Sequence, residues 1–260
     1  MNILITAGGT AEKIDEVRKI SNMATGRLGS IIADTMLNNE DINVTYLCSE
    51  DALTPQNNRA KVLYIDNVQS LKSTVEKLLR EQVFDAIIHS MAISDYTVKY
   101  SAPFEDLEQY LANYLSLNNS TELRNEEQLQ LRLHQALSEY RGQQAAPKIS
   151  SDIERLFLCL EKTPKIIRLF KQLQPKVVLV GFKLLVDVDE AELLKAAGKL
   201  MKDNQCDFVL ANDKRNIDAK HHAGILLEAD QSRQYLNTKQ EIADAITKCI
   251  VQTIKGRKEK

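Results

Sequence analysis

The sequence predicts an α/β protein built on a doubly wound, mainly parallel, Rossmann-like sheet. Short apolar runs of strand length recur along the chain, such as NILITA at 2–7 and VVLVGF at 177–182. Amphipathic segments with helical spacing separate many of these runs, and this alternation is typical of a parallel sheet covered by helices. A glycine pair, Gly8 and Gly9, ends the first run and marks a tight turn.

The first half of the chain yields two helices and four strands. The run 68–81 is an amphipathic helix because its leucines and valines fall on one face. The segment from 10 to 20 is polar, and we expect it to be irregular. The expected elements are strands at 2–7, 43–48, 61–65 and 85–90, and helices at 26–37 and 68–81.

The second half resumes the same alternation after a long interruption. We expect an extended segment at 148–160 and a helix at 165–172 with Pro164 in its first turn. The remaining expected elements are strands at 177–182, 207–211 and 225–228, and helices at 189–203 and 239–254. The interruption itself, residues 101–146, is polar and rich in Asn, Glu and Gln. We interpret it as a partly helical insertion, clearest over 125–140, within a single domain of residues 1–260.

Composition excludes several classes of protein. The chain has 260 residues, with Lys+Arg 34 against Asp+Glu 36, so bulk charge offers no attraction to nucleic acid or to an anionic membrane. No apolar run approaches the roughly 20 residues of a spanning helix, and no signal peptide precedes the first strand. We therefore expect a cytoplasmic protein with no membrane contact. The four cysteines form no CxxC pair, which favours free thiols, and no metal-ligand spacing stands out.

Ligands of open α/β sheets bind beyond the carboxyl ends of the strands, so the residues that follow each strand are the candidate site. They are Gly8, Gly9 and Thr10, then 89–95, then Phe182, and finally Asn212 and Asp213. The AGGT turn is not a dinucleotide fingerprint, because about fifteen residues separate it from the next helix, and no P-loop lysine follows. Taken alone, the AGGT segment is also compatible with a tight turn that binds no ligand.

Three further positions have both a chemical and a structural interpretation. Lys148 is suited to neutralising phosphate charge, although most lysines are simply solvated. The amides that open the helix near Lys165 are suited to cradling a phosphate. Asp95 follows a strand, where a carboxylate holds Mg²⁺ or a ligand hydroxyl, or else caps a turn.

Several separated segments together resemble the phosphopantothenate–cysteine ligase family, also called phosphopantothenoylcysteine synthetase. They occur in the family's order and run through nearly the whole chain except 101–146. The segments are ITAGGTAEKIDEVRKISNMATGRLG at 5–29, MAISDY at 91–96, KISS at 148–151, KTPKII at 162–167, LVGFKLL at 179–185 and VLANDKRNI at 209–217.

The resemblance implies a two-step ligation in coenzyme A biosynthesis. A nucleoside triphosphate with Mg²⁺ activates the 4′-phosphopantothenate carboxylate as an acyl-nucleotidylate, and pyrophosphate leaves. The amine of L-cysteine then attacks this mixed anhydride and expels the nucleoside monophosphate. A carboxylate that attacks a polyphosphate meets like charge, so the site must supply cations and N–H donors.

The resemblance also implies roles for particular residues. Asn22 contacts the pantothenate carboxylate and the acyl-phosphate, while Lys148 lies on a flap-like segment, 147–162, that covers the triphosphate. These two are the implied catalytic residues. The implied nucleotide-binding residues are Gly8, Gly9, Thr10, Gly26, Met91, Asp95, Pro164, Lys165, Ile166, Ile167, Phe182, Lys199 and Lys202. The implied substrate-binding residues are Asn22, Ala24, Thr25, Gly26, Arg27, Asn212 and Asp213.

Some features stay open at this point. CTP is favoured over ATP, a homodimer is expected from the family, and the spacer between Tyr96 and Lys148 is longer than in the bacterial fusion forms. Because the chain begins at the ligase domain, we expect the flavin-dependent decarboxylase of the pathway on a separate chain. A nicotinamide or flavin oxidoreductase is disfavoured by the missing GxGxxG and by the absence of an acidic residue ending the second strand. A non-catalytic binding protein is disfavoured by the presence of Asn22, Asp95 and Lys148.

Overall fold

The computed structural model describes residues 1–117, 125–142, 148–217 and 221–258. The chain forms two compact units where the sequence predicted one domain. We call them the sheet unit, made of Met1–Ala11, Ser21–Ser94 and Pro164–Lys260, and the hairpin unit, made of Glu12–Ile20 and Asp95–Thr163. The insertion expected at 101–146 is therefore part of a longer segment, Asp95–Thr163, which together with Glu12–Ile20 makes up the hairpin unit.

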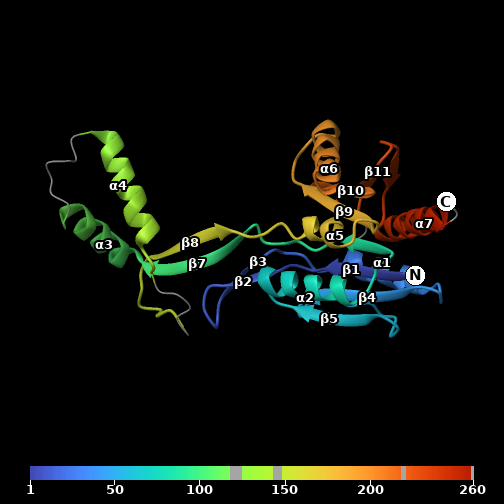
Figure 1. The fold of residues 1–260 in the computed structure, drawn as a ribbon, viewed down its shortest axis with the longest axis horizontal. Coiled ribbons are helices and arrows are strands. Elements are labelled where there is room, and N and C mark those ends of the chain that lie inside the picture. The colour runs from blue at the N-terminus through green and yellow to red at the C-terminus, as the bar shows by residue number, and fades with distance from the viewer. Residues whose placement is uncertain (118–124, 143–147, 218–220, 259–260) are drawn as a thin grey trace. The chain divides into compact units, whose positions relative to one another are not determined.

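An eight-stranded sheet organises the sheet unit (Figure 1). Its spatial order is β12-β11-β10-β9-β6-β1-β4-β5, and every pairing from β10 to β5 is parallel. Only β11 and β12 run antiparallel, at one edge. The strands are β1 Asn2–Ala7, β4 Asn43–Ser49, β5 Lys61–Ile65, β6 Ala86–His89, β9 Val178–Leu185, β10 Phe208–Asp213, β11 Gly224–Glu228 and β12 Arg233–Leu236.

Helices cover both faces of this sheet, so the predicted doubly wound α/β class is confirmed. Side chains alternate along β1: Ile3 and Ile5 enter the apolar cluster shared with α1 and α7, and Leu4 enters the cluster shared with α2, α5 and α6. Both clusters are fully buried at their centres. The helices are α1 Arg27–Leu37, α2 Val68–Glu81, α5 Ile167–Leu173, α6 Glu190–Asn204 and α7 Lys239–Lys258, with a short 3₁₀ turn at Lys214–Asn216.

Local sequence signals explain where two of these helices start. At α2, Asn67 accepts a hydrogen bond from the Ser70 backbone N–H at 2.8 Å, and the Ser70 hydroxyl accepts one from the Asn67 backbone N–H at 3.1 Å. This reciprocal pair satisfies two helix donors that would otherwise lack partners. At α6, Asp189 accepts from the Glu192 backbone N–H at 2.7 Å. Such caps depend only on neighbouring residues, which is why both starts were predictable from sequence.

The hairpin unit contains a long antiparallel pair that carries two helices. Tyr100 on β7 forms an aromatic contact with Tyr140 at 5.5 Å between ring centroids, and Tyr110 on α3 approaches the same ring at 4.7 Å. These contacts fasten both helices to the strand pair. The elements are β2 Ala11–Lys13, β3 Lys19–Ser21, β7 Tyr96–Pro103, α3 Phe104–Leu117, α4 Glu126–Glu139 and β8 Leu156–Lys162.

Several expectations about local structure were wrong. The segment 10–20 is not irregular, because β2 and β3 pair within it. The extended segment expected at 148–160 is a strand only from Leu156, and β7 and α3 were not recognised as elements of their own. Pro164 was expected in the first turn of the helix at 165–172, but α5 begins at Ile167, so Pro164 lies before it. The first hydrogen bond of this turn runs from the Arg168 N–H to the Lys165 carbonyl. The strands β7 and β8 are partly exposed, and apolar and polar residues do not alternate strictly along them as they do in a half-buried strand. This is why the sequence pattern did not reveal their bounds.

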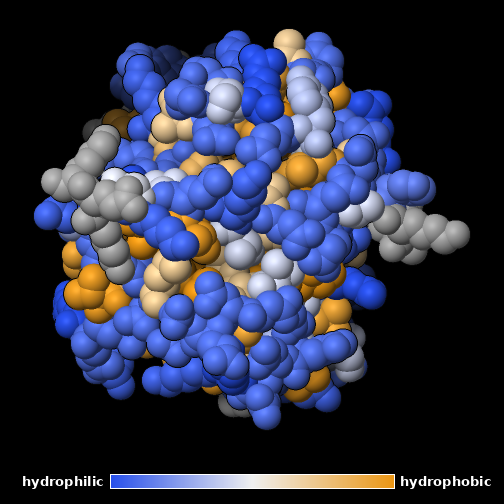
Figure 2. All heavy atoms as spheres, turned by 90° about the vertical axis from the view of Figure 1, so that its right-hand side faces the viewer, coloured by the Kyte–Doolittle hydropathy of each residue, from blue (hydrophilic) through white to orange (hydrophobic). Residues whose placement is uncertain are grey.

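The face of the molecule drawn in Figure 2 is mostly hydrophilic, with smaller apolar groups scattered between the charged residues. Within the ranges that the structure describes, no helix combines the length and the apolar character needed to cross a membrane. All four cysteines are free thiols; Cys48, Cys206 and Cys249 are buried and Cys159 is half-buried. Burial raises the pKa of the Cys206 thiol to about 12, so it stays protonated and unreactive.

Candidate ligand-binding site at the carboxyl edge of the sheet

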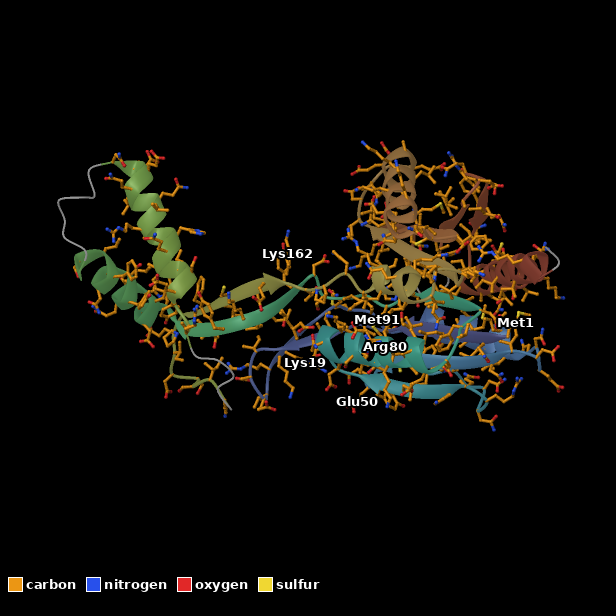
Figure 3. All side chains as sticks on the ribbon, viewed as in Figure 1. Met1, Lys19, Glu50, Arg80, Met91 and Lys162 are labelled. Atoms are coloured by element: carbon orange, nitrogen blue, oxygen red, sulfur yellow. The ribbon has the colours of Figure 1, made fainter. Side chains whose placement is uncertain are left out.

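The strand order places a topological switch point between β1 and β6. The parallel strands lie in the order 3-2-1-4-5-6 when numbered along the chain, and the connections leave β1 and β6 in opposite directions. In sheets of this kind the loops diverge there and leave room for a ligand at the carboxyl edge. Figure 3 shows the direction of the strands, with Met1 at one edge of the sheet and Glu50 and Met91 toward the other.

The loops that follow β1 and β6 are joined to each other at this point. The Ala92 N–H donates to the Gly8 carbonyl at 2.8 Å, and the Thr10 N–H donates back to the Ala92 carbonyl at 3.1 Å. The buried Thr10 hydroxyl accepts from the Ser94 N–H at 2.9 Å. The Asn22 side-chain amide also donates to the Ala92 carbonyl, at 3.2 Å. The structure therefore brings the AGGT turn, the MAISDY segment and Asn22 to one place.

Close packing explains the glycines of this junction. Gly8 has φ +81°, a conformation that side chains disfavour, and a Cβ there would lie 2.7 Å from the Ala52 Cβ. A Cβ on Gly9 would lie 2.8 Å from the backbone carbonyl oxygen of Asn22. The space beside these glycines is thus filled by protein loops. Gly9 in particular sets how closely the turn approaches Asn22.

The start of α1 borders the same junction. Gly26 precedes the helix with φ 73° and has no side chain to cap the first turn, while the Thr25 hydroxyl accepts from the Arg27 N–H at 3.4 Å. The Tyr46 hydroxyl connects this start to the loop after β4, since it lies 2.9 Å from the Leu53 carbonyl and 3.3 Å from the Gly26 carbonyl. The Leu53 N–H in turn donates to the Thr25 carbonyl at 2.9 Å. The expected substrate segment, from Asn22 to Arg27, is therefore fixed at several points along its backbone.

A buried histidine supports the end of β6. The His89 Nδ1 lies 2.7 Å from the Thr6 hydroxyl on β1, and its ring makes an edge contact with Phe170 on α5. Burial lowers the pKa of His89 to about 4, so the ring is neutral at physiological pH. The histidine thus ties two adjacent strands and a helix together directly beneath the junction.

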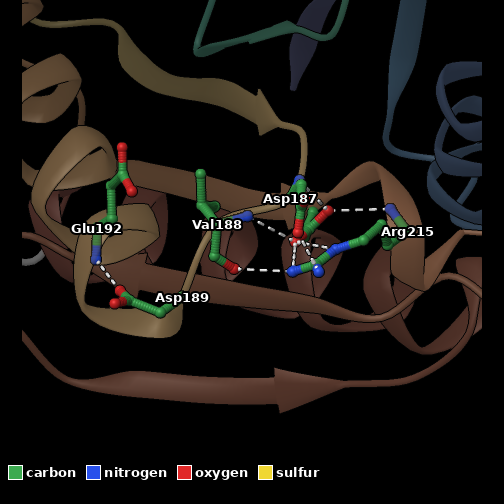
Figure 4. A network of polar contacts seen from close by, with 6 residues as sticks. Asp187, Val188, Asp189, Glu192 and Arg215 are labelled. Carbon is green, nitrogen blue, oxygen red and sulfur yellow. Dashed lines mark hydrogen bonds and ion pairs between the residues drawn. The ribbon is translucent and has the colours of Figure 1, made fainter.

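The polar residues at the end of β10 are occupied by the protein itself. Asn212 donates to the Ala223 carbonyl at 2.7 Å. The Asp213 carboxylate, 4% exposed, accepts from the backbone N–H groups of Asp187 and Val188 and from the guanidinium of Arg215 (Figure 4). Arg215 holds the pKa of Asp213 well below its usual range. Asp213 therefore shapes the loop that leads from β9 to α6, and Asn212 holds the segment that leads into β11. A direct contact of either residue with substrate stays a prediction.

The other expected nucleotide-binding residues of the sheet unit fall into two groups, one near the carboxyl edge of the sheet and one at the end of α6. The members of the first group are Met91, Pro164, Lys165, Ile166, Ile167 and Phe182. Met91 and Ile166 bury their side chains in the core, which leaves only their backbone groups for a ligand, and Phe182 is half-buried one residue beyond Gly181, the register partner of His89. Pro164, Lys165 and Ile167 lie at the start of α5.

The other group, Lys199 and Lys202, lies in the last two turns of α6. This end of the helix leads into β10, so it is at the opposite edge of the sheet from the junction. Lys199 is also ion-paired with Asp203 at 2.7 Å. The structure thus does not bring these two lysines to the site.

Asp95 and Lys148 belong to the hairpin unit, and both are exposed. The sequence analysis assigned no role to Asp15 or Arg18, which form an ion pair at 2.6 Å between a buried carboxylate and an exposed guanidinium. It also did not single out Ala92, whose backbone organises the junction. Among the described residues, no three His, Cys, Asp or Glu side chains gather in a group that could hold a metal ion.

The chain belongs to a known family. Residues 1–109 and 115–254 match the family described as DNA/pantothenate metabolism flavoprotein C-terminal domain. The matched ranges include every strand of the eight-stranded sheet.

Similar proteins of known sequence carry names from coenzyme A biosynthesis. The Coenzyme A biosynthesis bifunctional protein CoaBC of Thermococcus kodakarensis is 26% identical over 94% of this chain and 49% of its own length. The protein of the same name from Methanocaldococcus jannaschii is 27% identical over 92% of this chain and 45% of its own. The chain thus spans about half the length of these curated relatives.

Solved structures share the fold. The DNA/pantothenate metabolism flavoprotein from Streptococcus pneumoniae has a TM-score of 0.80 and 37% identity, covering 97% of this chain and 99% of that one. The C-terminal domain of a CoaBC protein has a TM-score of 0.67 at 21% identity, over 98% and 96% of the two chains. A Cab2 mutant in complex with phosphopantothenate-cysteine has a TM-score of 0.64 at 16% identity, over 98% and 88%.

Proposed function

We propose that this chain is a phosphopantothenate–cysteine ligase of coenzyme A biosynthesis. It activates the carboxylate of 4′-phosphopantothenate with a nucleoside triphosphate and then forms the amide with L-cysteine. The observation that carries the proposal is the junction at the switch point, where the AGGT turn, the loop after β6 and Asn22 share hydrogen bonds through Ala92. Membership of the family and the relatives named for coenzyme A biosynthesis give the substrate class.

Asn22 suits the second step chemically. Its amide uses one of two N–H donors on the Ala92 carbonyl, and the residue is exposed to solvent. An amide donates a hydrogen bond to an acyl-phosphate oxygen without adding charge of its own. As the cysteine amine attacks, the carbonyl oxygen becomes an oxyanion, and a positioned N–H donor stabilises that charge.

Lys148 suits the first step. The pantothenate carboxylate attacks the α-phosphate, the bond from that phosphorus to the bridging oxygen of pyrophosphate breaks, and negative charge accumulates on the leaving group. An exposed ammonium on a flexible stem is chemically suited to neutralise that charge. Mg²⁺, held by the triphosphate, neutralises the remainder.

The choice of nucleotide and the oligomeric state are also part of the proposal, and for both the sequence only favoured one alternative. The triphosphate is CTP in preference to ATP, and the protein acts as a homodimer. The glycines of the junction, Gly8, Gly9 and Gly26, with Thr10, form the floor that the phosphates approach. Phe182 and the start of α5 complete the nucleotide contacts.

Turnover of the purified chain tests the proposal. We expect phosphopantothenate, L-cysteine, Mg²⁺ and either CTP or ATP to give pyrophosphate and phosphopantothenoylcysteine, detected by a coupled phosphate assay and by mass spectrometry. Absence of pyrophosphate with both nucleotides would sink the proposal. Visible absorbance from a bound flavin, or calorimetric binding of a nicotinamide nucleotide, would favour an oxidoreductase instead.

Two variants separate the half-reactions. Asn22→Asp is expected to release pyrophosphate in a single-turnover burst and then stall, because the new carboxylate repels the acyl-phosphate. Asn43→Asp is the matched control, since it makes the same change at an exposed position that opens β4 at the opposite edge. Lys148→Ala is expected to slow the pyrophosphate burst itself, whereas Lys77→Ala, on the exposed face of α2, should not.

A further inference from the structure

The histidine at the end of β6 has one ring nitrogen that the protein does not use. His89 is 7% exposed, and its Nδ1 lies 2.7 Å from the Thr6 hydroxyl on β1. Its Nε2 has no hydrogen-bond partner among the described residues. Within that part of the chain, the fully buried side-chain atoms that lack a partner are the His222 Nδ1 and the Thr247 hydroxyl. The Nε2 of His89 is not one of them, so it keeps some contact with solvent.

Two contacts fix the orientation of this ring. Thr6 holds Nδ1 from the neighbouring strand, and Phe170 on α5 meets the ring edge-on, with 4.9 Å between the ring centroids and 69° between the planes. A neutral imidazole with one nitrogen engaged presents either an N–H donor or a lone pair at the other nitrogen. The Nε2 of His89 is thus held in place before any ligand binds, and such pre-organisation lowers the entropic cost of binding.

The ring lies at the carboxyl edge of the sheet, at the switch point. His89 is the last residue of β6, and its register partners are Thr6 on β1 and Gly181 on β9. Ile167, the first residue of α5, comes within 3.5 Å of where a Cβ on Gly181 would lie. Met91, two residues further on, packs into the apolar cluster between the sheet and α5. The ring therefore lies among residues of the sheet unit that were expected to contact the nucleotide.

Burial decides which part of a nucleotide suits this nitrogen. It lowers the pKa of His89 to about 4, so the ring carries no charge at physiological pH. Phosphate groups are bound most strongly by cationic donors, and a neutral ring is not one of them. The nucleoside offers uncharged carbonyl, amine and hydroxyl groups, and each of these forms a hydrogen bond with a neutral imidazole. The chemistry of the ring therefore favours the nucleoside over the phosphates.

We propose that the Nε2 of His89 hydrogen-bonds the nucleoside part of the triphosphate. This inference rests on the proposed function, in which a nucleoside triphosphate binds at the carboxyl edge of the sheet. The two ring nitrogens then have separate tasks, since Nδ1 joins β6 to β1 and Nε2 contacts the ligand. The side chain takes no part in making or breaking bonds. It acts on the binding of the triphosphate and not on the chemistry of either half-reaction.

Two amide substitutions in the full chain separate the two nitrogens. The amide of asparagine lies about where Nδ1 lies, and the amide of glutamine about where Nε2 lies. His89→Asn should raise KM for the triphosphate about five- to tenfold, with kcat changed less than about twofold, because one neutral hydrogen bond in the bound state is lost. His89→Gln should keep KM within about threefold of wild type, although Tm falls because the Thr6 hydroxyl loses its partner. His134→Asn is the matched control, since it makes the same change at an exposed position on α4 and should alter neither KM nor kcat.

Nitrogen NMR of protein with isotope-labelled histidine tests the contact without turnover. The Nε2 resonance of His89, assigned by its loss in His89→Asn, should shift when CMP or AMP is added and stay in place when pyrophosphate is added. A resonance that only pyrophosphate moves would overturn the inference, because the ring would then face the phosphates. A resonance that neither nucleotide moves, with KM raised equally by both substitutions, would overturn it by showing that His89 only stabilises the sheet.

The fate of the inference can be separated from that of the proposed function. Wild-type KM for CTP and ATP in His89→Asn, with normal formation of product, would overturn the inference and leave the proposed function standing. Absence of pyrophosphate from the wild-type chain would remove the proposed function. The response of the Nε2 resonance to CMP and AMP would then decide by itself whether His89 contacts a nucleoside.

Discussion

Gly9→Ala perturbs the junction at one defined contact. The added Cβ would lie 2.8 Å from the backbone carbonyl oxygen of Asn22, whereas ordinary contact begins near 3.4 Å. The Ala92 carbonyl lies farther away, at 3.6 Å, and Gly9 does not have a positive φ, so backbone strain is not the main effect. The carbonyl of Asn22 must therefore move by about 0.6 Å or more.

The size of that movement sets the expected effect. Misplacement of a reacting group by about 1 Å costs roughly a hundredfold in rate, so we expect the amide-forming step to slow about ten- to a hundredfold. The stability cost is that of mild overpacking, about 1 to 2 kcal/mol, which lowers Tm by only a few degrees in a chain of this length. Activity should thus fall far more than stability.

Rapid-quench measurement of phosphopantothenoylcysteine under single turnover tests this expectation. Gly198→Ala is the control, because no atom lies within 4 Å of the added Cβ and alanine favours the helix; it should keep full activity. The effect of Gly9→Ala should shrink on an Asn22→Ala background, where the side chain that it displaces is absent. A Gly9→Ala protein with the wild-type rate of amide formation would refute the reasoning.

Three further predictions concern stability and the residues around the site. Burial lowers the pKa of His89 from 6.5 to about 4, so between those values the unfolded chain binds a proton that the folded chain does not. The free energy of unfolding should therefore fall by up to about 3 kcal/mol as the pH drops from 6.5 to 4, and urea titrations of His89→Asn should lose that part of the pH dependence. Arg59→Ala should lower the free energy of unfolding by about 2 kcal/mol with kcat unchanged, because three carbonyls near the end of α1 lose their donor. Asp213→Ala should lower Tm and speed amide exchange at Asp187 and Val188, and a variant of unchanged Tm with lost substrate binding would show that Asp213 serves the ligand instead.

Local sequence patterns were sufficient to predict most helices and strands of the sheet unit. The helix predicted at 68–81 is α2 with the same bounds, because its capping residues and its apolar face are encoded by neighbours. The parallel strands were recognisable since strands buried on both faces form apolar runs. The antiparallel edge strand β12 was missed, as its four residues are half-exposed and form no apolar run.

Some residues of the candidate site could also be predicted from sequence motifs, whereas others could be judged only from the tertiary structure. The ordered motifs indicated that the AGGT turn, Asn22 and MAISDY act together, and the junction at Ala92 agrees with that grouping. Lys199 and Lys202 were included only because the family resemblance implied further nucleotide contacts on this helix. Only the topology shows that this end of α6 lies at the opposite edge of the sheet from the junction.

The sequence by itself determined the fold class, the family and the segment that carries Asn22, because all three depend on short patterns and on their order along the chain. The tertiary structure decided which polar groups are already occupied. Asp213 and Asn212 are satisfied within the protein, and Asp15 is satisfied by Arg18 and Ile149. Such partners lie tens to more than a hundred residues apart in some cases. Hydrogen bonds across those separations form only once the strands and loops have packed, so no local pattern records them.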